Sequence, residues 1–139
     1  MKRFFLALAL AAAPTALMAE DVVYICDMDQ KARGIIQDQL ALAYNEETGA
    51  AFASDTLILH FDGKPAAATL TENTEKKQVF RWSVQMVNRS GQTTNMRYRA
   101  ALIRKSGQVL VHAQPAGYGN NFTARGKCAV TNMRPMGLG

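Results

Sequence analysis

Two cysteines are the residues whose chemistry the sequence predicts most directly. Cys26 and Cys128 are the only cysteines in a chain of 139 residues, and neither belongs to a CxxC motif of the redox or zinc-binding kind. An even number of cysteines favours a disulfide in an oxidising compartment. We therefore expect Cys26 and Cys128 to pair with each other. By reducing the entropy of the unfolded chain, this disulfide would stabilise the fold by about 4.7 kcal/mol at most.

The first residues of the chain indicate such a compartment. Lys2 and Arg3 precede an uncharged apolar run over residues 4–13, and the small residue Ala19 follows. This is the pattern of a secretory signal peptide, here over residues 1–19. No later segment approaches the roughly 18 apolar residues that a membrane-spanning helix needs. We expect a periplasmic or secreted protein without a transmembrane segment.

The net charge limits the class of partner. The chain contains 16 basic and 11 acidic residues, a formal charge of +5. Removal of Lys2 and Arg3 with the signal peptide leaves 14 basic residues against 11 acidic ones, a charge of +3. So small an excess is not typical of proteins that bind polyanions. We expect no nucleic-acid partner.

One group of basic residues is nevertheless concentrated on one predicted face. The group, called the basic strip below, comprises Arg81, Arg97, Arg99, Arg125 and Lys127. Like charges that face each other across two strands destabilise a sheet. The basic strip therefore predicts either acidic neighbours or an anionic partner, which would be an acidic protein or an anionic envelope component such as lipopolysaccharide or a phosphorylated glycan.

Residues suited to catalysis or metal binding are few. The serines lack a GxSxG motif, so a triad would have to assemble by folding from residues such as Ser83, His112 and Asp62. His60 is the only other histidine, and two imidazoles are too few for a zinc site unless carboxylates complete it. We expect both histidines to be structural residues in apolar strands. We expect no enzymatic activity, no metal and no cofactor.

Two further motifs have structural interpretations. Asp27 and Asp29 resemble the start of a calcium-binding loop, but the remaining ligands do not follow at the required spacing. The segment 117–121 is glycine-rich, but no Gly-Lys-Ser/Thr follows it, as a phosphate-binding loop requires. We interpret the first motif as a strand end with solvated carboxylates and the second as a turn before the last strand.

Alternation of apolar and polar residues predicts a single all-β domain over residues 20–130, followed by a flexible tail over residues 131–139. The expected strands cover residues 22–27, 35–44, 56–61, 67–71, 79–87, 93–103, 109–113 and 122–129. The second strand is the least determined, because residues 35–47 also have the spacing of an amphipathic helix that ends before Gly49.

The strands over residues 79–87 and 93–103 form the best-determined hairpin. A three-residue loop over residues 89–91, with its glycine in the left-handed conformation, matches the apolar faces of both strands. This register places Trp82 opposite Tyr98 and Arg81 opposite Arg99.

The next hairpin leaves two registers open. We prefer a two-residue turn of Ser106 and Gly107, which aligns Val111 with Leu102. A three-residue loop, which would place His112 on the apolar face, is the alternative.

Eight antiparallel strands in consecutive hairpins, with the first and last joined by a disulfide, predict either a meander closed into a barrel or a two-sheet sandwich.

Several of these residues resemble those of known protein groups. Small uncharacterised exported β-proteins of alphaproteobacteria share the pattern of Tyr24, Cys26, Trp82, residues 98–100, Gly126 and Cys128. That resemblance implies no activity. The Tyr-x-Cys sequence, the β-rich body and the late cysteine more weakly resemble the periplasmic C-type lysozyme inhibitors, which are eight-stranded barrels. The inhibitory motif of that family, Ser-Gly followed by Tyr and a later Lys-Gly, is not met, so no inhibitory residue is carried over.

The sequence favours a function in binding rather than in catalysis. The expected protein is an exported, non-enzymatic β domain that binds a protein or an anionic envelope component through its surface. The alternatives are a lysozyme-inhibitor-like protein, a structural or envelope-assembly factor, and a small hydrolase.

Overall fold

The structure is a computed structural model that describes residues 21–29 and 35–131. The expected signal peptide over residues 1–19 lies outside the described residues. Most of the expected tail lies outside them as well. Its first residue, Thr131, is described and belongs to the last strand.

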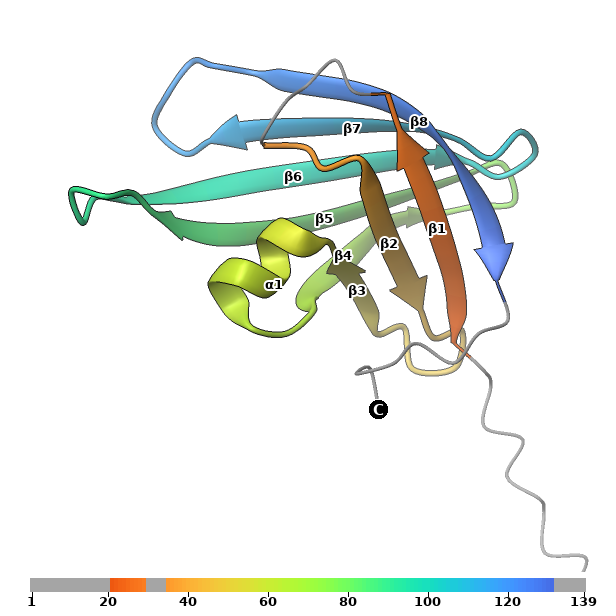
Figure 1. Ribbon diagram of the computed structural model, residues 1–139. Coiled ribbons are helices and arrows are strands. Elements are labelled where there is room, and N and C mark those ends of the chain that lie inside the picture. Colours follow the sequence, from red (N-terminus) through yellow and green to blue (C-terminus); the bar gives the residue numbers. More distant parts are fainter. Residues whose placement is uncertain (1–20, 30–34, 132–139) are drawn as a thin grey trace, which may run out of the picture.

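Eight antiparallel strands follow one another in chain order and close into a barrel (Figure 1). The strands are β1 (Val22–Met28), β2 (Gln39–Tyr44), β3 (Ala51–Ser54), β4 (Ala66–Asn73), β5 (Lys77–Val87), β6 (Thr93–Ile103), β7 (Gln108–Pro115) and β8 (Phe122–Thr131). Each strand pairs with the next, and β8 pairs with β1. The all-β prediction is confirmed, and of the two architectures left open the chain adopts the barrel.

The seam between β1 and β8 is closed by a covalent bond as well as by hydrogen bonds. Cys26 and Cys128 lie directly opposite each other in the β1–β8 register, and they form a disulfide across a sequence separation of 102 residues. Both side chains point into the barrel and are buried. The predicted pairing is confirmed, and it joins the first strand to the last where the barrel closes.

Large apolar side chains fill the interior of the barrel. Phe80 and Val84 are fully buried, and Trp82 stacks on Tyr98 with the ring centroids 5.3 Å apart and the planes nearly parallel. The Trp82 Nε1–H has no hydrogen-bond acceptor among the described residues. Trp82 and Tyr98 line neither of the two cavities described below. These two aromatic residues are therefore part of the core.

A buried polar chain lies at another level of the interior. The Tyr24 hydroxyl donates a hydrogen bond of 2.7 Å to Gln78 Oε1, and Gln78 Nε2 donates one of 3.0 Å to Asn73 Oδ1. Burial, and secondarily the neighbouring Tyr44, raise the pKa of Tyr24 to about 12. Because buried polar groups cost free energy unless they are paired, these hydrogen bonds let Tyr24 and Gln78 pack within the apolar barrel, with the exposed Asn73 at the end of the series.

The hairpin of β5 and β6 has the predicted register. Trp82 lies opposite Tyr98, and Arg81 lies opposite Arg99. Asn88 N–H donates to the Gln92 carbonyl at 3.0 Å, so the loop comprises the three residues between them, and its glycine has a φ of 82°. Since a positive φ carries no steric cost for glycine, the turn and the face alternation specify the same register.

The predicted register of the next hairpin is wrong by two residues. Val109, not Val111, lies opposite Leu102, and the loop between β6 and β7 has four residues, 104–107. Gly107 has a φ of 75°, and a Cβ at this position would lie 2.5 Å from the carbonyl oxygen of Cys128. The longer loop allows this close approach, in which the Gly107 carbonyl accepts a hydrogen bond of 2.7 Å from the Cys128 N–H.

The strand predicted over residues 56–61 is wrong, because that segment forms the helix α1 (Thr56–Asp62). The Asp55 carboxylate accepts a hydrogen bond of 2.7 Å from the Ile58 N–H, which caps the first turn. Gly63 ends the helix in the left-handed conformation, with its N–H bonded to the Leu59 carbonyl. The two caps favour a helix over the apparent alternation of apolar residues. The third of the eight strands is therefore β3, which lies before this helix in the sequence.

The strand preferred over a helix at residues 35–44 is confirmed, but it begins later. β2 starts at Gln39, while Ile35 and Ile36 lie in the turn before it. Helix α1 contacts β3 and β5 (Figure 1). Within the described part of the chain, no helix is long and apolar enough to cross a membrane.

Candidate functional site

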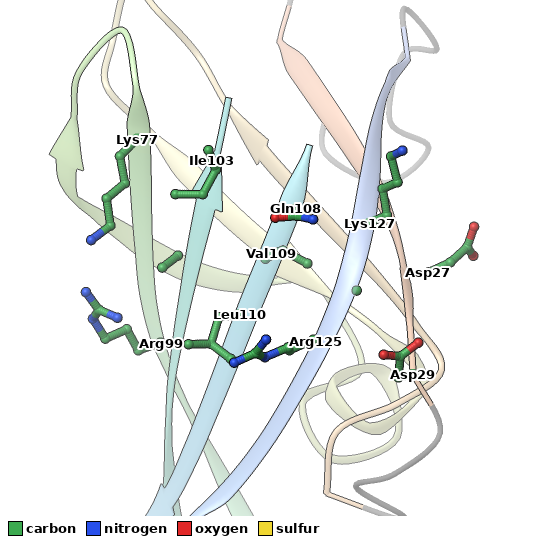
Figure 2. A pocket seen from close by; sticks show the side chains of 12 residues that line it. Asp27, Asp29, Lys77, Arg99, Ile103, Gln108, Val109, Leu110, Arg125 and Lys127 are labelled. Atoms are coloured by element: carbon green, nitrogen blue, oxygen red, sulfur yellow. The ribbon is translucent and has the colours of Figure 1, made fainter. Parts of the chain in front are cut away.

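A groove crosses the outer surface of the barrel over five strands, from β5 to β1. Its volume is about 610 Å³. We call it the outer groove; it is lined by Lys77, Arg99, Ala101, Ile103, Gln108, Val109, Leu110, Arg125, Gly126, Lys127, Asp27 and Asp29. Three residues of the basic strip, Arg99, Arg125 and Lys127, are among those that line it (Figure 2).

Strand alternation and one small residue form this groove. On β6, Arg99, Ala101 and Ile103 all point outward, because residues two apart lie on one face of a strand. Ala101 lies opposite Leu110 on β7, which in turn lies opposite Arg125 on β8. The Ala101 side chain is shorter than those of Arg99 and Ile103 on either side of it along β6. The outer surface is therefore hollow at Ala101.

The floor of the outer groove is apolar. Leu110 is 37% exposed and Ile103 is 42% exposed, which places both among the large apolar side chains that face solvent. Together with Ala101 they form an uncharged area between the charged ends of the groove. A floor of this kind removes apolar ligand surface from water, which contributes about 25 cal/mol for each Å² buried.

Four cationic side chains border this floor. They are Lys77, Arg99, Arg125 and Lys127. None of them has an ion-pair partner or a side-chain hydrogen bond within the residues that the structure describes. The acidic neighbours that would neutralise a purely structural cluster are therefore not bonded to these cations in residues 21–29 and 35–131.

Two carboxylates lie at the far end of the outer groove. Figure 2 shows Asp27 and Asp29 on the side away from Lys77 and Arg99. Asp27 lies opposite Lys127 in the β1–β8 register, but its Oδ1 instead accepts a hydrogen bond of 3.5 Å from Gln39. The two carboxylates thus lie beside the cations of β8, with Asp27 opposite Lys127 and the Asp29 N–H bonded to the Arg125 carbonyl, but no ion pair joins them among the described residues.

The predicted basic strip divides into two parts. Arg99, Arg125 and Lys127 line the outer groove, whereas Arg81 and Arg97 lie on the same face outside it. Arg81 is directly opposite Arg99, an arrangement that costs a few tenths of a kcal/mol to about 1 kcal/mol.

Two of the residues that line the groove, Lys77 and Leu110, were not predicted from the sequence. The strand alternation could have revealed Lys77, because residues 77, 79 and 81 share the outer face of β5. No local pattern indicates a role for the exposed Leu110. Asp27 and Asp29 are exposed, as expected for a strand end, but their position beside the groove depends on the closure of β1 onto β8.

The candidate catalytic residues do not come together. Ser83 on β5 and His112 on β7 are separated by β6, and His112 Nδ1 is 3.3 Å from the Thr123 hydroxyl. His60 lies at the end of α1, not in the expected strand, and its ring contacts Phe61 edge-on. Within the described residues, no group of three or more His, Cys, Asp or Glu side chains could hold a metal ion.

A second cavity of about 410 Å³ lies where the β5–β6 hairpin approaches the loop between β7 and β8. It is lined by Ile35, Phe61, Met86, Val87, Asn88, Thr94, Met96, Pro115, Tyr118, Asn120 and Phe122. Most of these side chains are apolar, and none is charged.

Comparison of the chain with models of protein families, with curated proteins and with solved structures gives no match. The geometry of the outer groove is accordingly the basis for the functional proposal.

Proposed function

We propose that this chain is an exported, non-enzymatic binding domain that holds an anionic partner, an acidic protein or an anionic envelope component, in the outer groove. The single observation that carries the proposal is the set of four cations, Lys77, Arg99, Arg125 and Lys127, which border an exposed apolar floor without ion-pair partners among the described residues. Such a site supplies both charge and apolar contact.

The cost of assembling these cations supports the proposal. Arg99 lies directly opposite Arg81, and two residues further along β6 Ala101 begins the row that crosses Leu110 to Arg125. Repulsion between like charges reduces the stability of the sheet, and an anionic partner would relieve it. A partner that also covers Leu110 would gain from the burial of apolar surface.

The disulfide supports the proposed export to the periplasm or the outside of the cell. The Cys26–Cys128 bond joins two buried sulfur atoms, and structural disulfides persist in oxidising compartments. The signal peptide proposed for residues 1–19 would deliver the chain to such a compartment.

A capture experiment with two matched variants tests the proposal. The mature domain is crosslinked to partners in native cell envelopes and purified. The groove variant carries Arg99→Glu and Arg125→Glu. The control variant carries Arg89→Glu and Arg97→Glu, which make the same change of charge outside the groove and away from the position opposite Arg99.

The proposal predicts that the wild type and the control variant capture the same species and that the groove variant loses it. Equal capture by all three proteins would contradict the proposal, because the groove would then play no part in binding. Loss from the control variant alone would contradict the proposal, because it would place the binding surface at Arg89 and Arg97 instead.

A further inference from the structure

The charges of the outer groove follow a fixed order across the strands. Lys77 on β5 and Arg99 on β6 form the first positive region. The apolar floor with Leu110 follows on β6 and β7. Arg125 and Lys127 on β8 form the second positive region, and β1 supplies the two carboxylates. The order is positive, apolar, positive, negative.

The spacing of these regions follows from the sheet. Neighbouring strands lie about 4.8 Å apart, so β8 is roughly 10 Å from β6 and about 14 Å from β5. The midpoint of the first positive region is therefore about 12 Å from the second. The carboxylates lie on the next strand, β1, whose backbone is roughly 5 Å from that of β8.

An extended peptide has a matching repeat. Alternate side chains point to one face and recur about every 6.7 Å. Residues four positions apart on that face are therefore about 13 Å apart, close to the separation of the two positive regions. The residue between them would lie over the apolar floor, and the next residue on the same face would reach Asp27 and Asp29.

We propose that the outer groove binds an extended acidic segment of a partner protein, laid across the strands, whose alternate residues are acidic, apolar, acidic and basic. This inference rests on the proposed function and names the partner class for the same site. The two acidic side chains bind the two positive regions, the apolar side chain packs on Leu110 and Ala101, and the basic side chain lies at Asp27 and Asp29.

The carboxylates favour a peptide over a lipid or glycan that carries only negative charge. Asp27 and Asp29 are exposed at the end of the groove, where they repel an anionic surface and attract a cation. A hollow floor also fits an inserted side chain better than a flat array of headgroups. A segment with charges of both signs in order satisfies both ends of the groove.

The test uses two synthetic peptides of seven residues with blocked termini and serine at every even position. In the first, the odd positions are Glu, Leu, Glu and Lys. In the second, Leu and Lys exchange places, so composition and net charge are identical. Binding to the wild-type domain is measured by titration calorimetry. The proposal predicts that the first peptide binds at least about tenfold more tightly.

A charge exchange on the protein tests the orientation. A third peptide replaces the terminal Lys of the first with Glu. The wild type should prefer the peptide that ends in Lys, and the Asp29→Lys variant should prefer the one that ends in Glu. Leu110→Ser should reduce the discrimination between the first two peptides. Both variants change exposed outer side chains, and their unfolding midpoints serve as the control for folding.

Equal affinity of the wild type for the first two peptides overturns this inference, as does unchanged preference in the Asp29→Lys variant. If no peptide binds while envelope capture of a lipid or glycan depends on Arg99 and Arg125, the inference fails and the proposed function stands. If capture does not depend on those two arginines, the proposed function fails as well.

Discussion

The inner and outer faces of β5 to β8 differ in how deeply their side chains are buried and in how their charged and polar groups are paired. On the inner face, Phe80 and Val84 are fully buried and the Gln78 amide is hydrogen-bonded on both sides. On the outer face, Arg99 and Arg125 have no partner among the described residues. Since neighbouring residues of a strand belong to opposite faces, one set of strands carries both the stability and the proposed site, and mutation can separate the two.

The largest expected effect is on the inner face. Phe80→Ala would leave a cavity at a side chain with 0% exposure and should reduce the free energy of unfolding by about 3–5 kcal/mol. The adjacent outer substitution Arg81→Ala should change it by no more than about 0.5 kcal/mol. Urea denaturation of both variants checks the comparison, and similar losses for the two would break it.

The second effect is at the seam. The double substitution Cys26→Ala and Cys128→Ala removes the bond that joins β1 to β8, and we expect a loss of about 2–5 kcal/mol. The same loss should appear when the wild type is reduced. A urea midpoint that does not move on reduction would show that the strand pairing alone closes the barrel.

The regions that the sequence predicted well are those where several local signals agree. In the β5–β6 hairpin, the alternation around Trp82 and Tyr98 and the glycine at the third loop position specify one register. The two cysteines allow only one intramolecular pair. These features required no knowledge of distant contacts.

The errors arose where a weak pattern competed with caps or with a distant contact. Residues 56–61 alternate in hydrophobicity, but Asp55 and Gly63 cap a helix there. The β6–β7 loop depends on the approach of Gly107 to Cys128, which lies beyond any local pattern.

The outer groove was only partly predictable. Its arginines share a face by alternation, but its carboxylates reach it through barrel closure, which brings β1 beside β8.

A smaller effect is expected from alkaline pH and again concerns the inner face. Burial raises the pKa of Tyr24 to about 12, above its unfolded value of about 10. The folded state then holds the proton more tightly, so this contribution to stability is complete below pH 10 and is lost as the pH rises toward about 12. Burial also raises the pKa of Tyr98, which acts in the same direction.

Denaturation midpoints measured between pH 9 and pH 12, for the wild type and for Tyr24→Phe, check this prediction. The variant should be less stable at neutral pH, because the Gln78 carbonyl loses its donor, at a cost of about 1–3 kcal/mol. It should also lose less stability than the wild type as the pH rises. Parallel curves would contradict the assignment to Tyr24.

The smallest effect on stability is expected from the groove itself. The Arg99→Glu and Arg125→Glu variant should differ from the wild type by no more than about 0.5 kcal/mol. The Arg99→Glu substitution should add a little stability, because it places a negative charge opposite Arg81. A large loss of stability would mean that these arginines are structural, which would remove the distinction between the two faces.

The most direct test of the central claim is to locate an anionic probe on the folded domain. Amide spectra of the ¹⁵N-labelled protein are recorded during titration with polyglutamate in low salt. We expect the shifts to cluster around Lys77, Arg99, Leu110 and Arg125 and to vanish in the groove variant. Shifts spread equally over exposed loop residues such as Lys105, or unchanged by reversal of the groove charges, would contradict it.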